Sequence, residues 1–70
     1  MNFYEFLESI NDKYERAYNC YLSGKYEEEF SFIDQALGMK TAFFIFFGNK
    51  YELVMSEDYE YIHYSVKPVE

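Results

Sequence analysis

The chain has 70 residues, which is enough for one small domain, and a lone core of this size is only marginally stable. Half of the residues are hydrophobic and 24% are aromatic, a composition that argues against intrinsic disorder. Thirteen acidic residues against six basic ones give a net charge of −7. This charge disfavours direct binding to nucleic acid or to an anionic membrane, because phosphate contacts need Lys and Arg.

Compartment signals are few. The single cysteine, Cys20, excludes an internal disulfide framework. The first residues carry acids and no basic segment, which is not the pattern of a signal peptide. No apolar run approaches the roughly 18 residues that a membrane span needs. We therefore expect a cytoplasmic protein without membrane association, in the host cytoplasm if it is phage-encoded.

Residues 2–22 are predicted to form one amphipathic helix. Asn2 can cap its start, with Glu5 three residues further on as its capping-box partner. Apolar residues recur at three- and four-residue steps, which places them on one face. This predicted buried face comprises Phe3, Phe6, Leu7, Ile10, Tyr14, Ala17, Tyr18 and Tyr21.

The opposite face of this helix is acidic. Glu5, Glu8, Asp12 and Glu15 follow one another at steps of three, four and three residues. Glu8 and Asp12 are like charges four residues apart, which costs a few tenths of a kcal/mol. The stripe is either a functional surface or simply a solvated helix face.

Gly24 is suited to end the first helix, and residues 25–37 are predicted to form a second one. The helix dipole favours the three glutamates, residues 27–29, in its first turn. Phe32 points away from the predicted stripe, so it is either covered by another element or exposed as a contact anchor. The stripe expected to be buried comprises Tyr26, Phe30, Ile33 and Leu37.

The junction between these helices resembles that of a tetratricopeptide repeat. Ala17, Gly24 before Tyr26, and the Ala36–Leu37 pair stand at the spacing of the repeat. The chain departs from the pattern at Glu29, where the repeat has a small residue, and the likeness covers less than half of the chain without recurring. The resemblance implies an antiparallel helix hairpin, and a short peptide-binding module is one functional reading of it.

Three strands are predicted after Gly38. Residues 39–47 are aromatic and β-branched, residues 50–55 alternate after the turn at Gly48 and Asn49, and residues 59–66 alternate again until Pro68 ends the pairing. The predicted fold is α+β: a helix hairpin (1–37), a three-stranded antiparallel β-meander (39–66) and a tail (67–70), forming a single domain (1–70). Its order is ααβββ.

The first predicted strand creates a difficulty. Residues 41–47 would be apolar on both faces and would lie at a sheet edge, where exposed strands are normally blunted by charge. We expect a homodimer that closes this strand, with a partner protein or a helix wrapped over the edge as alternatives. The predicted self-association residues are Phe43, Phe44, Ile45, Phe46 and Phe47.

No residue pattern points to catalysis. His63 is the only histidine, and Tyr59 and Tyr61 on its side of the strand resemble a stacked row rather than a triad. One His and one Cys fall short of a transition-metal site, and no calcium or phosphate loop occurs. We expect a non-enzymatic protein without catalytic residues, metal or cofactor.

A small acidic inhibitor of a basic, nucleic-acid-binding protein is the favoured function. In size and charge the chain is similar to phage-encoded nucleic-acid mimics such as uracil-DNA glycosylase inhibitors and anti-restriction or anti-CRISPR proteins. Carboxylates about 5–6 Å apart on a helix compare with phosphates along a strand. The candidate acidic surface comprises Glu5, Glu8, Asp12, Glu15, Glu27, Glu28 and Asp34, and the candidate apolar contacts are Phe32, Tyr59 and Tyr61. The alternative is a homodimeric structural or adaptor protein whose acidity serves only solubility.

Overall fold

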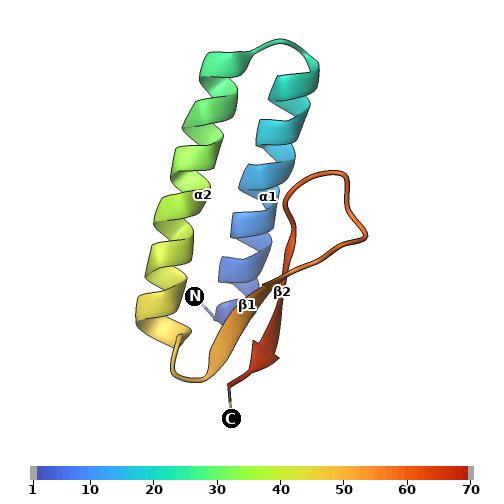
Figure 1. Ribbon diagram of the computed structural model, residues 1–70. Helices are drawn as coiled ribbons and strands as arrows, with labels where there is room; N and C mark the ends of the chain where they lie inside the picture. The colour runs from blue at the N-terminus through green and yellow to red at the C-terminus, as the bar shows by residue number, and fades with distance from the viewer. Residues whose placement is uncertain (1, 70) are drawn as a thin grey trace.

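The computed structural model describes residues 2–69. Helices α1 (Phe3–Leu22) and α2 (Tyr26–Phe47) form an antiparallel hairpin, and a two-stranded sheet lies across one face of it (Figure 1). Strands β1 (Tyr51–Met55) and β2 (Tyr64–Pro68) are antiparallel, and residues 56–63 connect them. The α+β class is confirmed. The predicted three-stranded meander is wrong, because the chain folds as ααββ.

Helix α1 begins and ends as its sequence predicts. The Glu5 backbone N–H donates to Asn2 Oδ1 at 2.9 Å, which caps the start. Gly24 has φ +74°, and the Lys25 N–H donates back to the Cys20 carbonyl at 2.8 Å. This pattern is a Schellman motif, which needs a left-handed residue after the last turn.

Helix α2 continues through the segment predicted as the first strand. The residues of this segment that face the core recur with helical spacing: Ala36, Met39, Phe43 and Phe47. Packing against α1 therefore favours the helix over a strand in this aromatic run. Gly38 does not end the helix, and a Cβ at this position would stand in open space. The sequence prediction failed because a fully aromatic run satisfies a strand and a helix equally well.

The buried face of α2 also differs from the predicted stripe. Tyr26, Phe30 and Leu37 are 56%, 62% and 49% exposed, and Ile33 is half-buried. Helix α2 carries apolar residues on two adjacent faces, and only one of them meets α1. Hydrophobic periodicity cannot decide which of two adjacent apolar faces is buried.

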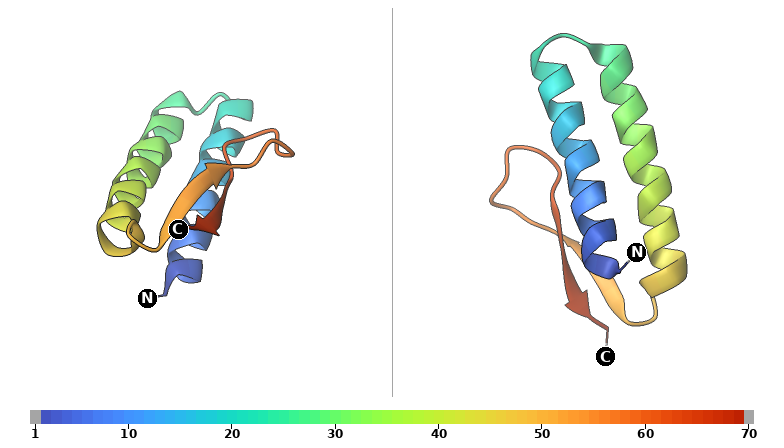
Figure 2. Two further views of the ribbon diagram at one scale, coloured as in Figure 1. Left: turned by 60° about the horizontal axis from the view of Figure 1, so that its bottom comes forward. Right: turned by 180° about the vertical axis from the view of Figure 1, so that it is seen from behind.

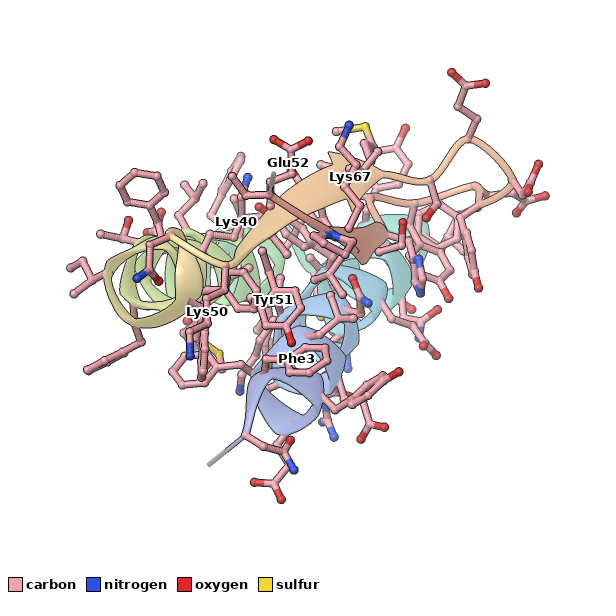
Figure 3. The ribbon with its side chains drawn as sticks, turned by 90° about the horizontal axis from the view of Figure 1, so that it is seen from below. Phe3, Lys40, Lys50, Tyr51, Glu52 and Lys67 are labelled. Atoms are coloured by element: carbon pink, nitrogen blue, oxygen red, sulfur yellow. The ribbon has the colours of Figure 1, made fainter. Side chains whose placement is uncertain are left out.

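The two strands form a small layer over the hairpin. In Figure 3, Phe3 of α1 lies beside Tyr51 of β1, and their ring centres are 4.3 Å apart. Glu52 and Lys67 lie on the other face of the sheet, with 2.9 Å between carboxylate and ammonium. Pro68 is paired opposite Tyr51, so the expectation that it ends the pairing is wrong. Proline is tolerated here because the Tyr51–Pro68 pair is a non-hydrogen-bonded pair, which needs no N–H from residue 68. The neighbouring hydrogen bond runs from the Val69 N–H to the Lys50 carbonyl.

The outer edge of β2 is closed at Tyr64 by a side chain of α1. Asn11 Nδ2 donates to the Tyr64 carbonyl at 2.9 Å, and the Tyr64 N–H donates to Asn11 Oδ1 at 2.8 Å. The amide thus takes the place of one residue of a neighbouring strand, which ties the sheet to the helix and protects this edge.

The buried core is small. Ile10 and Ala36 are fully buried, Phe43 is 1% exposed, and Tyr14 and Tyr64 complete the cluster from α1 and β2. Lys40 Nζ donates to the Tyr64 hydroxyl at 2.7 Å beside this cluster. The core therefore joins both helices to the second strand, and it leaves the closed end of the hairpin exposed at Tyr21, Leu22 and Tyr26.

Candidate functional site

The four acidic residues predicted on α1 line one open groove of about 800 Å³. The groove runs between α1 and the 56–63 loop, which projects beside α1 on the side away from α2 (Figures 1 and 2). The predicted contacts Tyr59 and Tyr61 line it as well. Its full lining is Glu5, Glu8, Ser9, Asn11, Asp12, Lys13, Glu15, Tyr59, Tyr61 and His63. We call it the acidic–aromatic groove.

Three rings of the loop form the aromatic part of this groove. The Tyr59 and His63 rings stack with centres 3.7 Å apart and planes 8° apart. Tyr61 meets Tyr59 edge-on at 5.6 Å. The stacked row predicted for these side chains is present, although residues 59–63 form a loop and not a strand.

Polar contacts fix this loop to α1. The Tyr18 hydroxyl donates to a Glu60 carboxylate oxygen at 3.0 Å, and the Tyr61 hydroxyl donates to Glu15 at 3.4 Å. The hydrogen bond to Glu60 raises the pKa of Tyr18, and partial burial together with the Glu15 charge raises the pKa of Tyr61. Both phenols therefore remain neutral donors that hold acidic side chains in place.

The carboxylates of the groove are mostly free of cations. Asp12 forms an ion pair with Arg16 at 2.7 Å on the exposed helix surface. Among residues 2–69, Glu5, Glu8 and Glu15 belong to no ion pair. The Lys13 ammonium lies 5.7 Å from the Phe32 ring centre on α2. The groove therefore offers unpaired negative charge beside aromatic rings, a combination that suits a cationic ligand group.

The other predicted acidic residues lie apart from this groove. Glu27, Glu28 and Asp34 are exposed on the first half of α2, and none of them lines it. Phe32 is half-buried under the Lys13 ammonium, and it does not line the groove. The structure thus gathers four of the seven predicted acids and two of the three predicted apolar contacts.

The five residues predicted for self-association are the last five residues of α2. Phe43 lies in the core, and Phe47 meets Phe6 with ring centres 5.7 Å apart. Phe44, Ile45 and Phe46 are 74%, 71% and 67% exposed. Since the segment is helical, its apolar residues point in several directions and cannot act as a single strand.

Ser9, Asn11 and Lys13 belong to the groove but were not singled out by sequence reasoning. Their participation depends on where the 56–63 loop returns along α1, and no local pattern encodes that return. His63 was the exception, because its alternation with Tyr59 and Tyr61 indicated a common row.

The fold and groove define a small α+β protein with an acidic, aromatic surface site. No family model matches the chain, and no curated protein or solved structure shows significant similarity to it.

Within the described residues, one helix, α2, is long and apolar enough to cross a membrane by length and composition alone, although core helices pass the same test. The expectation that no apolar segment approaches this length was therefore wrong.

Proposed function

We propose that this protein is a non-enzymatic inhibitor that binds a basic surface of another protein through the acidic–aromatic groove. The observation that carries the proposal is that Glu5, Glu8, Asp12 and Glu15 line one open groove together with Tyr59 and Tyr61. A guanidinium or ammonium group entering the groove meets carboxylates and a ring face together, and each adds to the binding energy.

A nucleic-acid-binding protein is the proposed class of target. Such proteins present Lys and Arg at positions that match phosphates, and a row of carboxylates on a helix competes for them. Binding of this kind is fast and sensitive to salt, because long-range attraction supplies much of it. A homodimeric adaptor whose acids serve only solubility remains the alternative, and it requires no specific contact in the groove.

The test uses a labelled Arg/Gly-rich peptide and its Lys/Gly counterpart as probes, titrated in low and in high salt. Replacing Glu8 and Glu15 by Gln should weaken binding of the Arg peptide by about tenfold, or about 1.4 kcal/mol. The control replaces Glu57 by Gln and Asp58 by Asn in the same loop. It changes the net charge equally, and both residues lie outside the groove. Equal weakening in both variants would mean that only net charge acts, and this result would contradict the proposal.

A second arm tests the proposed target class. Basic proteins retained from a lysate on the immobilised chain should be released by short duplex DNA, and the Glu8→Gln, Glu15→Gln variant should retain much less. Retained proteins that DNA does not displace would contradict mimicry of nucleic acid while leaving a basic protein partner in place.

A further inference from the structure

The exposed apolar face of α2 has the spacing of a helix–helix interface. Tyr26, Phe30, Ile33, Leu37, Lys40 and Phe44 follow at steps of four, three, four, three and four residues. This is the a/d pattern of a packed helix pair. We call these six residues the α2 seam. Tyr26, Phe30, Leu37 and Phe44 are its exposed apolar residues, whereas Ile33 and Lys40 are half-buried at its margin and Lys40 donates to Tyr64.

The large apolar side chains of the seam are exposed in a single chain. Phe44 is 74% exposed, and Tyr26, Phe30 and Leu37 are between 49% and 62% exposed. At 3.6 residues per turn these four lie within about 40° of one another and extend over about 27 Å of helix. Helix α1 packs on a neighbouring face of α2 through Ala36 and Phe43, so nothing among residues 2–69 covers this row.

The distribution of charge along α2 favours a second copy as the occupant. All acidic residues of α2 lie in its first half: Glu27, Glu28, Glu29 and Asp34. From residue 35 to residue 51 the chain has no acid, and its charged residues are Lys40 and Lys50. An antiparallel copy of α2 therefore places the acidic half of each helix against the half of the other that carries Lys40 and no acid, and it also opposes the two helix dipoles.

We propose that two copies of this chain associate through antiparallel packing of their α2 seams about a twofold axis near Leu37. Leu37 then meets its own counterpart, and Phe30 of each copy faces Phe44 of the other, because these two positions are equally distant from residue 37. Such a contact is self-complementary, as a twofold interface requires. It extends the proposed function, since the acidic–aromatic groove lies on the α1 side and a dimer carries two grooves.

The available area is consistent with a dimer of moderate affinity. With about 200 Å² for a large side chain, the four exposed seam residues present roughly 500 Å², compared with about 800 Å² per partner in a standard interface. Ile45, 71% exposed, and the flanking polar residues can supply the remainder.

Solution mass tests the interface. Analytical ultracentrifugation of the unmodified chain should give twice the 8.5 kDa chain mass at tens of micromolar. Leu37→Glu should give a monomer with unchanged helical circular dichroism. Gln35→Glu on the opposite side of α2 adds the same charge and should stay dimeric. A monomeric unmodified chain would overturn the proposal, as would a Leu37→Glu variant that stays dimeric.

A cysteine at the axis tests the antiparallel geometry. In a Cys20→Ser background, Leu37→Cys should oxidise to a covalent dimer, whereas Gln35→Cys should not, because only facing positions near the axis bring two sulfurs within bonding distance. Equal cross-linking at both positions would overturn the arrangement. Monomers that sediment with neutral lipid vesicles would identify a membrane as the occupant instead. Peptide binding to the groove of Leu37→Glu should be unchanged per chain, so the two proposals can fail independently.

Discussion

At the residue scale, Asn11 makes the two hydrogen bonds with β2 that a neighbouring strand would otherwise make. Its side-chain amide satisfies both the carbonyl and the N–H of Tyr64, at 2.9 and 2.8 Å, in a partly buried site. Sequence patterning did not single out this residue, since a polar residue at the edge of a helix face looks like any solvated position. Its role depends wholly on where β2 meets α1.

Replacing Asn11 by Ala should lower the free energy of unfolding by about 1–3 kcal/mol, because it leaves two backbone groups of Tyr64 without partners. Asn19→Ala on the exposed surface of the same helix is the matched control. Urea denaturation gives both values. If the two variants lost equal stability, the amide bridge would carry no special energy.

Lys40 and Tyr14 make the stability dependent on alkaline pH. Burial alone would lower the pKa of Lys40, but its hydrogen bond to Tyr64 and its interaction with Tyr14 raise it above the ordinary value of 10.5. Burial raises the pKa of Tyr14 above 10.0. The folded state therefore holds both protons more tightly than the unfolded state, and stability present below pH 10 is lost as the pH rises.

Thermal unfolding measured from pH 8 to pH 11 should show a melting temperature that falls above pH 10. Lys40→Met should flatten part of that decline, whereas Lys50→Met, at an exposed position, should leave it as it is. A Lys40→Met profile with the same slope as the unmodified chain would show that the Lys40 contacts do not contribute to it.

At the scale of the elements, two glycines have opposite roles: one ends a helix and the other lies inside one. Gly24 adopts a left-handed conformation that ends α1, whereas Gly38 lies inside α2 with open space where its Cβ would be. Gly24→Ala should lower the free energy of unfolding by about 1 kcal/mol, and Gly38→Ala should raise it by about 0.5–1 kcal/mol. Chemical denaturation of both variants provides the check. Destabilisation by Gly38→Ala would place a backbone constraint at that position that its helical geometry does not suggest.

The two helices also differ in how well their sequences predicted them. The bounds, cap and buried face of α1 were predicted closely, because polar and apolar residues separate cleanly around it and Asn2 and Gly24 mark its ends. The exception is Tyr21, which was predicted to be buried and is 54% exposed. Helix α2 was predicted to end ten residues too early. Its second half is apolar on nearly all sides, so the sequence shows no alternation of polar and apolar faces that would indicate a helix. Gly38 was therefore interpreted as the end of the helix.

At the scale of the whole molecule, the acidic–aromatic groove and the α2 seam share no residue. The groove is bounded by α1 and the 56–63 loop, which lies on the side of α1 away from α2 (Figure 2), and the seam belongs to α2. The two surfaces come closest where Ile33 and Tyr61 line one pocket. Proposed partner binding and proposed dimerisation therefore use separate surfaces. Dimerisation was predicted from the sequence through an edge strand at residues 41–47. The dimer proposed from the structure instead uses an exposed apolar face of α2.

The sequence by itself determined the acidic charge, the α+β class, the helix hairpin and the course of α1, because charge, capping and periodicity are local properties. The tertiary structure alone decided the length of α2, its exposed face, the two-stranded sheet and the groove. Those features depend on which of several apolar faces meets another element, and on where a loop returns to a helix. Both are settled by packing between residues distant in the chain.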